Sequence, residues 1–112
     1  MKKLTSLFAV TALAALANSA TAAPPNAAFN GTVSEIFVNN SQVLIAVSGP
    51  VRGTCRGAFG PYNLTFNMSD PGAQMKFDIV MTAFKNGQRI AGYVDGCGSS
   101  NINRMHQVSV SR

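Results

Sequence analysis

Residues 69–97 read S-D-P-G-A-Q-M-K-F-D-I-V-M-T-A-F-K-N-G-Q-R-I-A-G-Y-V-D-G-C. Apolar residues in the first part of this stretch recur at the spacing of one helix face, which predicts a helix over 71–86. Asp70 is expected to cap its start, and Gly87 supplies a left-handed stop. A strand over 88–95 follows at once. The predicted core face of the helix consists of Ala73, Phe77, Val80, Met81 and Phe84.

The remainder of the chain after the first 22 residues has the pattern of strands and turns. Its apolar runs are separated by clusters of Asn, Ser, Gly and Pro, which favour turns and loops. The segment 62–68 alternates strictly, and the residues expected to point inward are Tyr62, Leu64, Phe66 and Met68. The five predicted strands are 29–38, 42–48, 62–68, 88–95 and 104–111. The order β-β-β-α-β-β predicts a mainly β fold with one helix, a five-stranded OB-fold Greek-key barrel.

The first 22 residues have the pattern of a signal peptide. Lys2 and Lys3 form a basic start, an apolar run covers 4–17, and the small residues of a cleavage site end at Ala22. The apolar run is shorter than the roughly 20 residues that a membrane-spanning helix needs. We therefore expect a bacterial protein in the periplasm or secreted, with 1–22 removed and a single OB-fold domain over 23–112.

The expected mature domain is only mildly basic. Seven Lys and Arg residues against four Asp and Glu residues give it a formal charge of +3, because two of the nine basic residues lie in the signal peptide. These charges are scattered along the chain, and few aromatic residues are expected to be exposed. The sequence therefore does not call for nucleic acid as a partner.

The two cysteines, Cys55 and Cys97, both lie in the mature domain. In an exported domain they are expected to form one disulfide, which would stabilise the fold by roughly 4 kcal/mol in the chain-entropy description. The alternative is a Cys97 nucleophile with His106 as its base, which requires a thiol that stays reduced after export. The carboxylates are few, and no His, Cys, Asp or Glu cluster has the spacing of a metal site. We expect a non-enzymatic protein with no metal and no cofactor.

Two short stretches carry a family pattern: F-N-G-T-V at 29–33 and A-F-K-N-G-Q-R-I-A-G-Y at 83–93. They resemble the B subunits of bacterial toxins built from one A and five B subunits, in the subtilase-cytotoxin and pertussis-like branch. The first is similar to the family's F-S-G-V-V opening, whose serine contacts a sialic acid. The second is similar to the family's helix end, its T-G-Q-P-V turn and a strand with tyrosines near the glycan. In this chain Asn30 stands at the serine position, and Tyr93 matches one tyrosine, with Val94 in the next place.

The resemblance implies an OB-fold subunit that assembles as a homopentamer, binds a sialoglycan on cell surfaces and associates with a catalytic A subunit. It implies that Asn30 and Tyr93 are glycan-binding residues. Met75 and Ile79 form a second apolar flank of the helix, and the family's helix meets neighbouring subunits. The alternative for this flank is a broad core face, which is common for a helix in a small domain.

Arg52, Arg56 and Arg104 are further candidates for the glycan site. A disulfide that brings the loop over 49–61 close to the loop after the fourth strand would let them form an anion-binding rim. Such a rim would suit a sialic carboxylate or a phosphate. The alternative is that all three are solvated surface side chains.

Two functions of different classes are compatible with these patterns. The first is an exported, non-enzymatic glycan-binding subunit of a ring, in which multivalency raises a weak single-site affinity. The second is a monomeric periplasmic OB-fold protein with a structural or stress-related role and no glycan ligand. The oligomeric state of the mature, oxidised protein distinguishes them.

Overall fold

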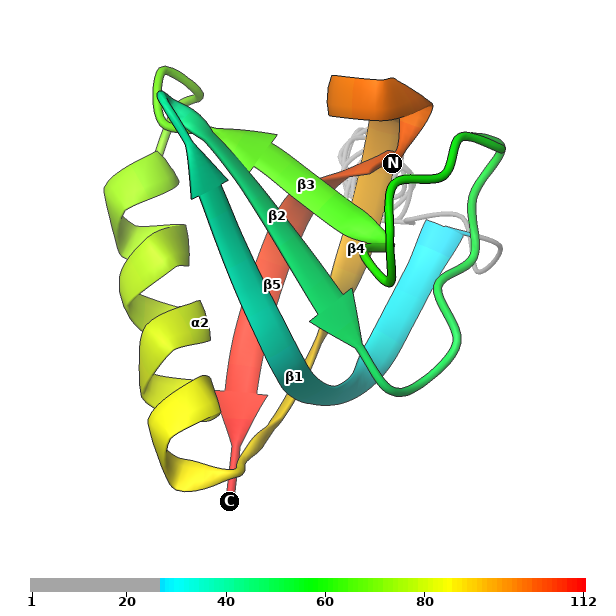
Figure 1. Ribbon diagram of the computed structural model, residues 1–112. Helices are drawn as coiled ribbons and strands as arrows, with labels where there is room; N and C mark the ends of the chain where they lie inside the picture. Colours follow the sequence, from blue (N-terminus) through cyan, green and yellow to red (C-terminus); the bar gives the residue numbers. More distant parts are fainter. Residues whose placement is uncertain (1–26) are drawn as a thin grey trace, which may run out of the picture.

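The computed structural model describes residues 27–112, and this part of the chain forms five strands and one α-helix, whose arrangement is drawn in Figure 1. The predicted mainly β fold with a single helix is confirmed for these residues. The predicted signal peptide lies outside them. In chain order the elements are β1 (Ala28–Asn39), β2 (Gln42–Val47), β3 (Leu64–Asn67), α2 (Ala73–Asn86), β4 (Arg89–Cys97), the 3-10 turn η3 (Ser99–Asn101) and β5 (Asn103–Ser111).

The five strands pair in a closed ring in the order β1-β2-β3-β5-β4. β1 pairs with two neighbours: residues 28–32 pair with β4, and residues 33–39 pair with β2, with a bulge between Val33 and Glu35. The bulge bends the strand, which lets one strand belong to both sides of the ring. β3 and β5 are parallel and meet only at Thr65 and Arg104, so the ring is weakly joined along this seam.

The helix α2 lies along the ring beside β1 and β5 (Figure 1). Ala73, Val80 and Ala83 are buried against the strands, and Phe77 packs partly buried beside them. The two small alanines let the helix backbone come close to the strands. The predicted core face is therefore wrong at Phe84, which is 42% exposed, because α2 turns Ala83 toward the core instead. In residues 27–112 no helix has the length and apolar character needed to cross a membrane.

The start of α2 differs from the prediction and its end agrees with it. Gly72, in the left-handed conformation with φ 72°, precedes the first helical residue, and no side chain caps the helix there. The Asp70 carboxylate instead accepts a hydrogen bond from the backbone N–H of Asn67 at 3.0 Å, which closes the turn after β3. At the other end Gly87 has φ 64°, and its N–H donates to the carbonyl of Ala83.

The predicted disulfide between Cys55 and Cys97 is present, with Cα atoms 5.7 Å apart. It fastens the loop over 48–63 to the end of β4. The Asn103 side chain accepts from the backbone N–H of Cys55 at 3.2 Å, and the Gly57 N–H donates to the carbonyl of Asn101 at 2.9 Å. Within residues 27–112 no cysteine is free, so the alternative of a Cys97 thiol nucleophile does not match this structure.

The strand predicted over 62–68 is shorter, and Tyr62 does not point inward. Leu64 and Phe66 are buried in the core as expected. Tyr62 lies in the loop before β3, and its hydroxyl donates to the Glu35 carboxylate at 2.6 Å on the outside of the ring. There it forms a cluster with Phe37 and Phe59, with ring centroids between 5.6 and 5.9 Å apart.

Candidate functional site

The outer face of β1 and β4 holds a shallow cavity of about 410 Å³, completed by β5. Antiparallel pairing places Asn30 opposite Ala91 and Tyr93 opposite Ala28. All four residues line the cavity, so the two residues predicted to bind glycan lie at one site. The pairing of β1 with β4 brings them together from distant parts of the chain.

The cavity has a small apolar floor and a polar rim. Ala28 and Ala91 supply short side chains on the floor, while β5 adds Gln107 and Ser109 on the same face. The Ser109 hydroxyl donates to the carbonyl of Ala91 at 3.3 Å and keeps its lone pairs for another donor. Amide, hydroxyl and phenol groups therefore surround a shallow apolar patch.

Gly92 lets this face lie directly over the hydrophobic core. A Cβ atom at this position would lie 1.9 Å from the carbonyl oxygen of Gln107 and 2.9 Å from Cζ of Phe29. Phe29 is buried, with 2% of its surface exposed, and its ring fills the space below the cavity. The floor is thus supported by a packed aromatic ring, which makes the site rigid.

Asn30 is oriented by a residue that the sequence analysis did not select. The Arg89 guanidinium donates to Oδ1 of Asn30 at 2.7 Å across β1 and β4. With its oxygen so engaged, Asn30 presents its NH₂ group to the outside. Arg89, Ala91 and Tyr93 alternate along β4, so the period of two was the signal that places Arg89 on this face.

The three arginines predicted for the rim do not meet at this cavity. Arg52 is held through its backbone N–H, which donates to the carbonyl of Ala28 at 3.0 Å. The Arg56 guanidinium donates to the carbonyl of Gly53, also at 3.0 Å. Arg104 lines two other hollows at the end of the ring, and neither includes Arg52 or Arg56. A shared anion rim is therefore not formed by these side chains in the described cavities.

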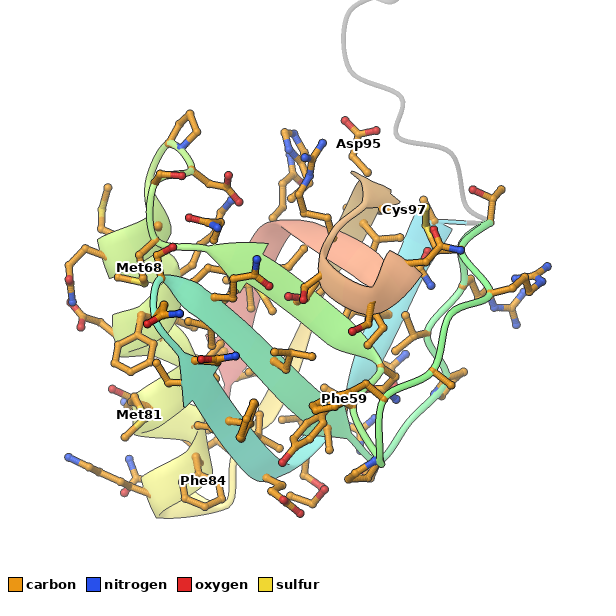
Figure 2. The ribbon with its side chains drawn as sticks, turned by 45° about the horizontal axis from the view of Figure 1, so that its top comes forward. Phe59, Met68, Met81, Phe84, Asp95 and Cys97 are labelled. Carbon is orange, nitrogen blue, oxygen red and sulfur yellow. A yellow bond between two sulfur atoms is a disulfide. The ribbon has the colours of Figure 1, made fainter. Side chains whose placement is uncertain are left out.

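The predicted oligomer interface on α2 is partly open to solvent. Met75 is 69% exposed, whereas Ile79 is half-buried. At other positions around α2, Met81 is half-buried and Phe84 is exposed, and Figure 2 labels both on this helix. Apolar side chains thus border the helix on two sides, and the interface stays a prediction.

The lining of the cavity on β1, β4 and β5 consists of apolar side chains and of groups that form hydrogen bonds. Between residues 27 and 112 no three His, Cys, Asp or Glu side chains gather closely enough to hold a metal ion. Comparisons with protein-family models, curated proteins and solved structures found no match for this chain. The site on β1, β4 and β5 therefore rests on its own geometry and on the resemblance of the two short stretches.

Proposed function

We propose that this protein is an exported, non-enzymatic subunit that binds cell-surface glycan at the cavity on β1, β4 and β5. The observation that carries the proposal is that Asn30 and Tyr93 line one cavity. These are the two residues to which the toxin B-subunit resemblance assigns glycan contact. We take the fold to be an OB-fold, supported by a ring of five strands with a helix between the third and fourth.

The chemistry of the cavity suits a sugar. A pyranose ring presents a C–H face that packs against an aromatic ring, and Tyr93 supplies that ring at the cavity edge. Hydroxyl groups of the sugar can pair with the amides of Asn30 and Gln107 and the hydroxyl of Ser109. Arg89 stands beside Asn30 and would favour a sugar that carries a carboxylate, such as a sialic acid.

An open and shallow site binds one sugar weakly, and assembly compensates for this. Several copies in a ring convert later contacts into intramolecular ones, which raises the overall affinity without new contacts. We propose that the ring is a homopentamer and that the Met75 and Ile79 flank of α2 takes part in it. Association with a catalytic A subunit is a further prediction of the resemblance.

The binding site is tested with a glycan array of the mature, oxidised protein. Asn30→Ala and Tyr93→Ala should each weaken binding about tenfold, since each removes a hydrogen bond or a stacking surface. Asn86→Ala is the matched control, because it removes an exposed amide at the end of α2 that does not line the cavity. Binding that is unchanged in Asn30→Ala and Tyr93→Ala contradicts the assignment of the site.

The assembly is tested separately by native mass spectrometry. A ring of five copies is the expected result, and Met75→Asp should shift it toward smaller species because it places a charge on the exposed flank. A monomer at micromolar concentration that binds no glycan would instead favour a monomeric OB-fold protein with a structural or stress-related role.

A further inference from the structure

A second hollow, of about 380 Å³, lies between the start of α2 and the end of the ring. It is separate from the proposed glycan cavity and shares no lining residue with it. Its lining is rich in charge of both signs. The titratable residues that line it are Asp70, Lys76, Asp95, Arg104 and His106.

Arg104 is held in place although it is exposed. Its Nε donates to the backbone carbonyl of Asp95 at 3.1 Å. The guanidinium lies over Gly96, where a Cβ atom would come within 3.0 Å of a terminal nitrogen. Gly96 also has φ +76°, a conformation that favours glycine. The hydrogen bond holds the guanidinium beside the end of β4, and Arg104 lines the hollow there.

Two other charged side chains of the hollow, those of Lys76 and Asp70, also bond to backbone groups. The Lys76 ammonium donates to the carbonyl of Met105 at 3.4 Å. The Asp70 carboxylate accepts from the N–H of Asn67 at 3.0 Å. None of these contacts joins a cation of the hollow to one of its carboxylates. Arg104, Lys76 and Asp70 thus bond to backbone groups rather than to an opposite charge of the hollow.

A ligand with a single charge fits such a lining poorly. An anion near Arg104 and Lys76 is repelled by Asp70 and Asp95. A cation near these two carboxylates is repelled by Arg104 and Lys76. A ligand that carries both charges a few bonds apart satisfies both sets of groups. Figure 2 shows the Asp95 side chain projecting at this end of the ring, where it borders the hollow.

A smaller hollow of about 210 Å³ adjoins the first, because Arg104 and Asp70 line both. It lies at the seam where β3 and β5 meet only at Thr65 and Arg104. Gln42 and Ser99 bring an amide and a hydroxyl to it. A substituent of the ligand, beyond its two charges, therefore has polar space on the other side of Arg104.

We propose that this hollow binds a small zwitterion in which a primary ammonium lies a few bonds from an oxyanion. Arg104 and Lys76 hold the oxyanion, and Asp95 and Asp70 hold the ammonium. The site does not depend on the glycan function, because it lies on a different surface. An α-amino acid and a phosphoethanolamine group share this chemistry.

The test titrates the mature, oxidised protein with O-phosphoethanolamine, inorganic phosphate and ethanolamine by calorimetry, with NMR shifts to locate binding. Phosphoethanolamine should bind about tenfold or more tightly than either of the other two probes, and should shift the amides of Gly96 and Gly98. Phosphate that binds as tightly as phosphoethanolamine overturns the proposal, as does the absence of binding by all three probes at millimolar concentration.

Variants assign the two halves of the site. Lys76→Gln should weaken phosphoethanolamine about tenfold, whereas Lys85→Gln, on the exposed last turn of the same helix, should leave it unchanged. Asp95→Asn should weaken phosphoethanolamine but strengthen inorganic phosphate, because it removes an opposing charge. Equal effects of Lys76→Gln and Lys85→Gln, or of Asp95→Asn on both probes, contradict the assignment even where the variants fold normally.

The source of the zwitterion is distinguished with two further probes. Alanine carries the same ammonium beside a carboxylate, and vesicles of phosphatidylethanolamine carry it beside a phosphodiester. Binding of alanine supports a free amino acid as ligand. Cosedimentation with phosphatidylethanolamine vesicles, reduced in Lys76→Gln and not in Lys85→Gln, supports a lipid headgroup.

Discussion

The ring has two outer faces that are treated in opposite ways. On the face of β2, Leu44 and Ala46 point away from the core, yet they are only 3% and 4% exposed. The loop over 48–63 crosses this face, and Figure 2 shows Phe59 lying over it. On the face of β1, β4 and β5, by contrast, Asn30 and Ala91 remain open to solvent.

The difference shows which structural features are needed to bury the outer face of a strand. The cover of β2 uses a long loop, a disulfide, an aromatic cluster and the Asn63 side chain, whose amide pairs with both the N–H and the carbonyl of Val47. The same loop bonds to the backbone of β1 at Ala28 and Asn30, but the outer face of β1, β4 and β5 carries partly or fully exposed alanines, amides and hydroxyls. The residues on this face are small or polar and suit exposure to solvent. This agrees with our proposal that the ligand binds there.

Removal of the disulfide should have the largest effect on the stability of the covered face. Replacing Cys55 and Cys97 by serine releases a loop with a sequence separation of 42 and should lower the free energy of unfolding by about 4 kcal/mol. Trypsin should then cut after Arg52 or Arg56 in the released loop, while Arg89 on the paired strand β4 stays protected. A loss below about 1 kcal/mol would show that the cover holds without the bond.

Gly92→Ala tests the packing below the floor of the cavity on the open face. The added Cβ would meet the carbonyl of Gln107 and the ring of Phe29, so β4 and β5 must separate or the ring must move. We expect a loss of about 3 kcal/mol in denaturant unfolding. Ala91→Ser, one residue earlier and exposed, is the control and should change stability by less than about 0.5 kcal/mol. Equal stabilities of the two variants would mean that the floor is not packed as described.

Phe59→Ala removes the outermost ring of the cover. Phe59 is 45% exposed, so its removal lowers the free energy of unfolding less than removal of a fully buried ring. Its contacts with Phe37 and Tyr62 are lost as well. We expect a loss of about 2 kcal/mol, against less than about 0.5 kcal/mol for Ser109→Ala on the open face. A similar small loss in both variants would remove the contrast between the faces.

The sequence predicts the helix and the strands better than it predicts the long-range contacts between them. The spacing of apolar residues predicts α2 and the strands, and the glycine at position 87 predicts the end of the helix, because these signals are local. Tyr62 fits an inward strand position by alternation, yet a contact with Glu35 across the fold places it outside. Likewise, Phe84 fits the apolar stripe, but the close approach allowed by Ala83 determines which side faces the core.

The candidate site shows the same limit. Asn30 and Tyr93 were selected through a family resemblance, and nothing local predicts that they line one cavity. Their meeting depends on the register of β1 against β4, which is fixed by core packing on the other face of both strands. Arg104 and Arg52 do not line a common cavity among those described, and a disulfide fixes two Cα atoms but not the direction of nearby side chains.

The smallest expected effect concerns the hydrogen bond from Tyr62 to Glu35. This bond to the carboxylate raises the pKa of Tyr62 above its ordinary value of 10, with lesser contributions from desolvation and from the charge of Glu35. Tyr62 and Tyr93 are the two tyrosines of the chain, so a Tyr93→Phe variant isolates Tyr62 in a near-ultraviolet titration of the phenolate. The midpoint should lie above that of free tyrosine, and Glu35→Gln should lower it.

The direction of this pKa shift determines how the stability that the bond gives to the loop over 48–63 depends on pH. Because the folded state raises the pKa of Tyr62, the bond stabilises the fold fully below the unfolded value near 10 and is lost as the pH rises through the folded value. The aromatic cover should therefore loosen in alkali before the open face does. Glycan binding by the Tyr62→Phe variant at neutral pH should equal that of wild type, because Tyr62 is not part of the cavity lining. A Tyr62 midpoint that Glu35→Gln leaves unchanged would show that the contact does not hold the cover in solution.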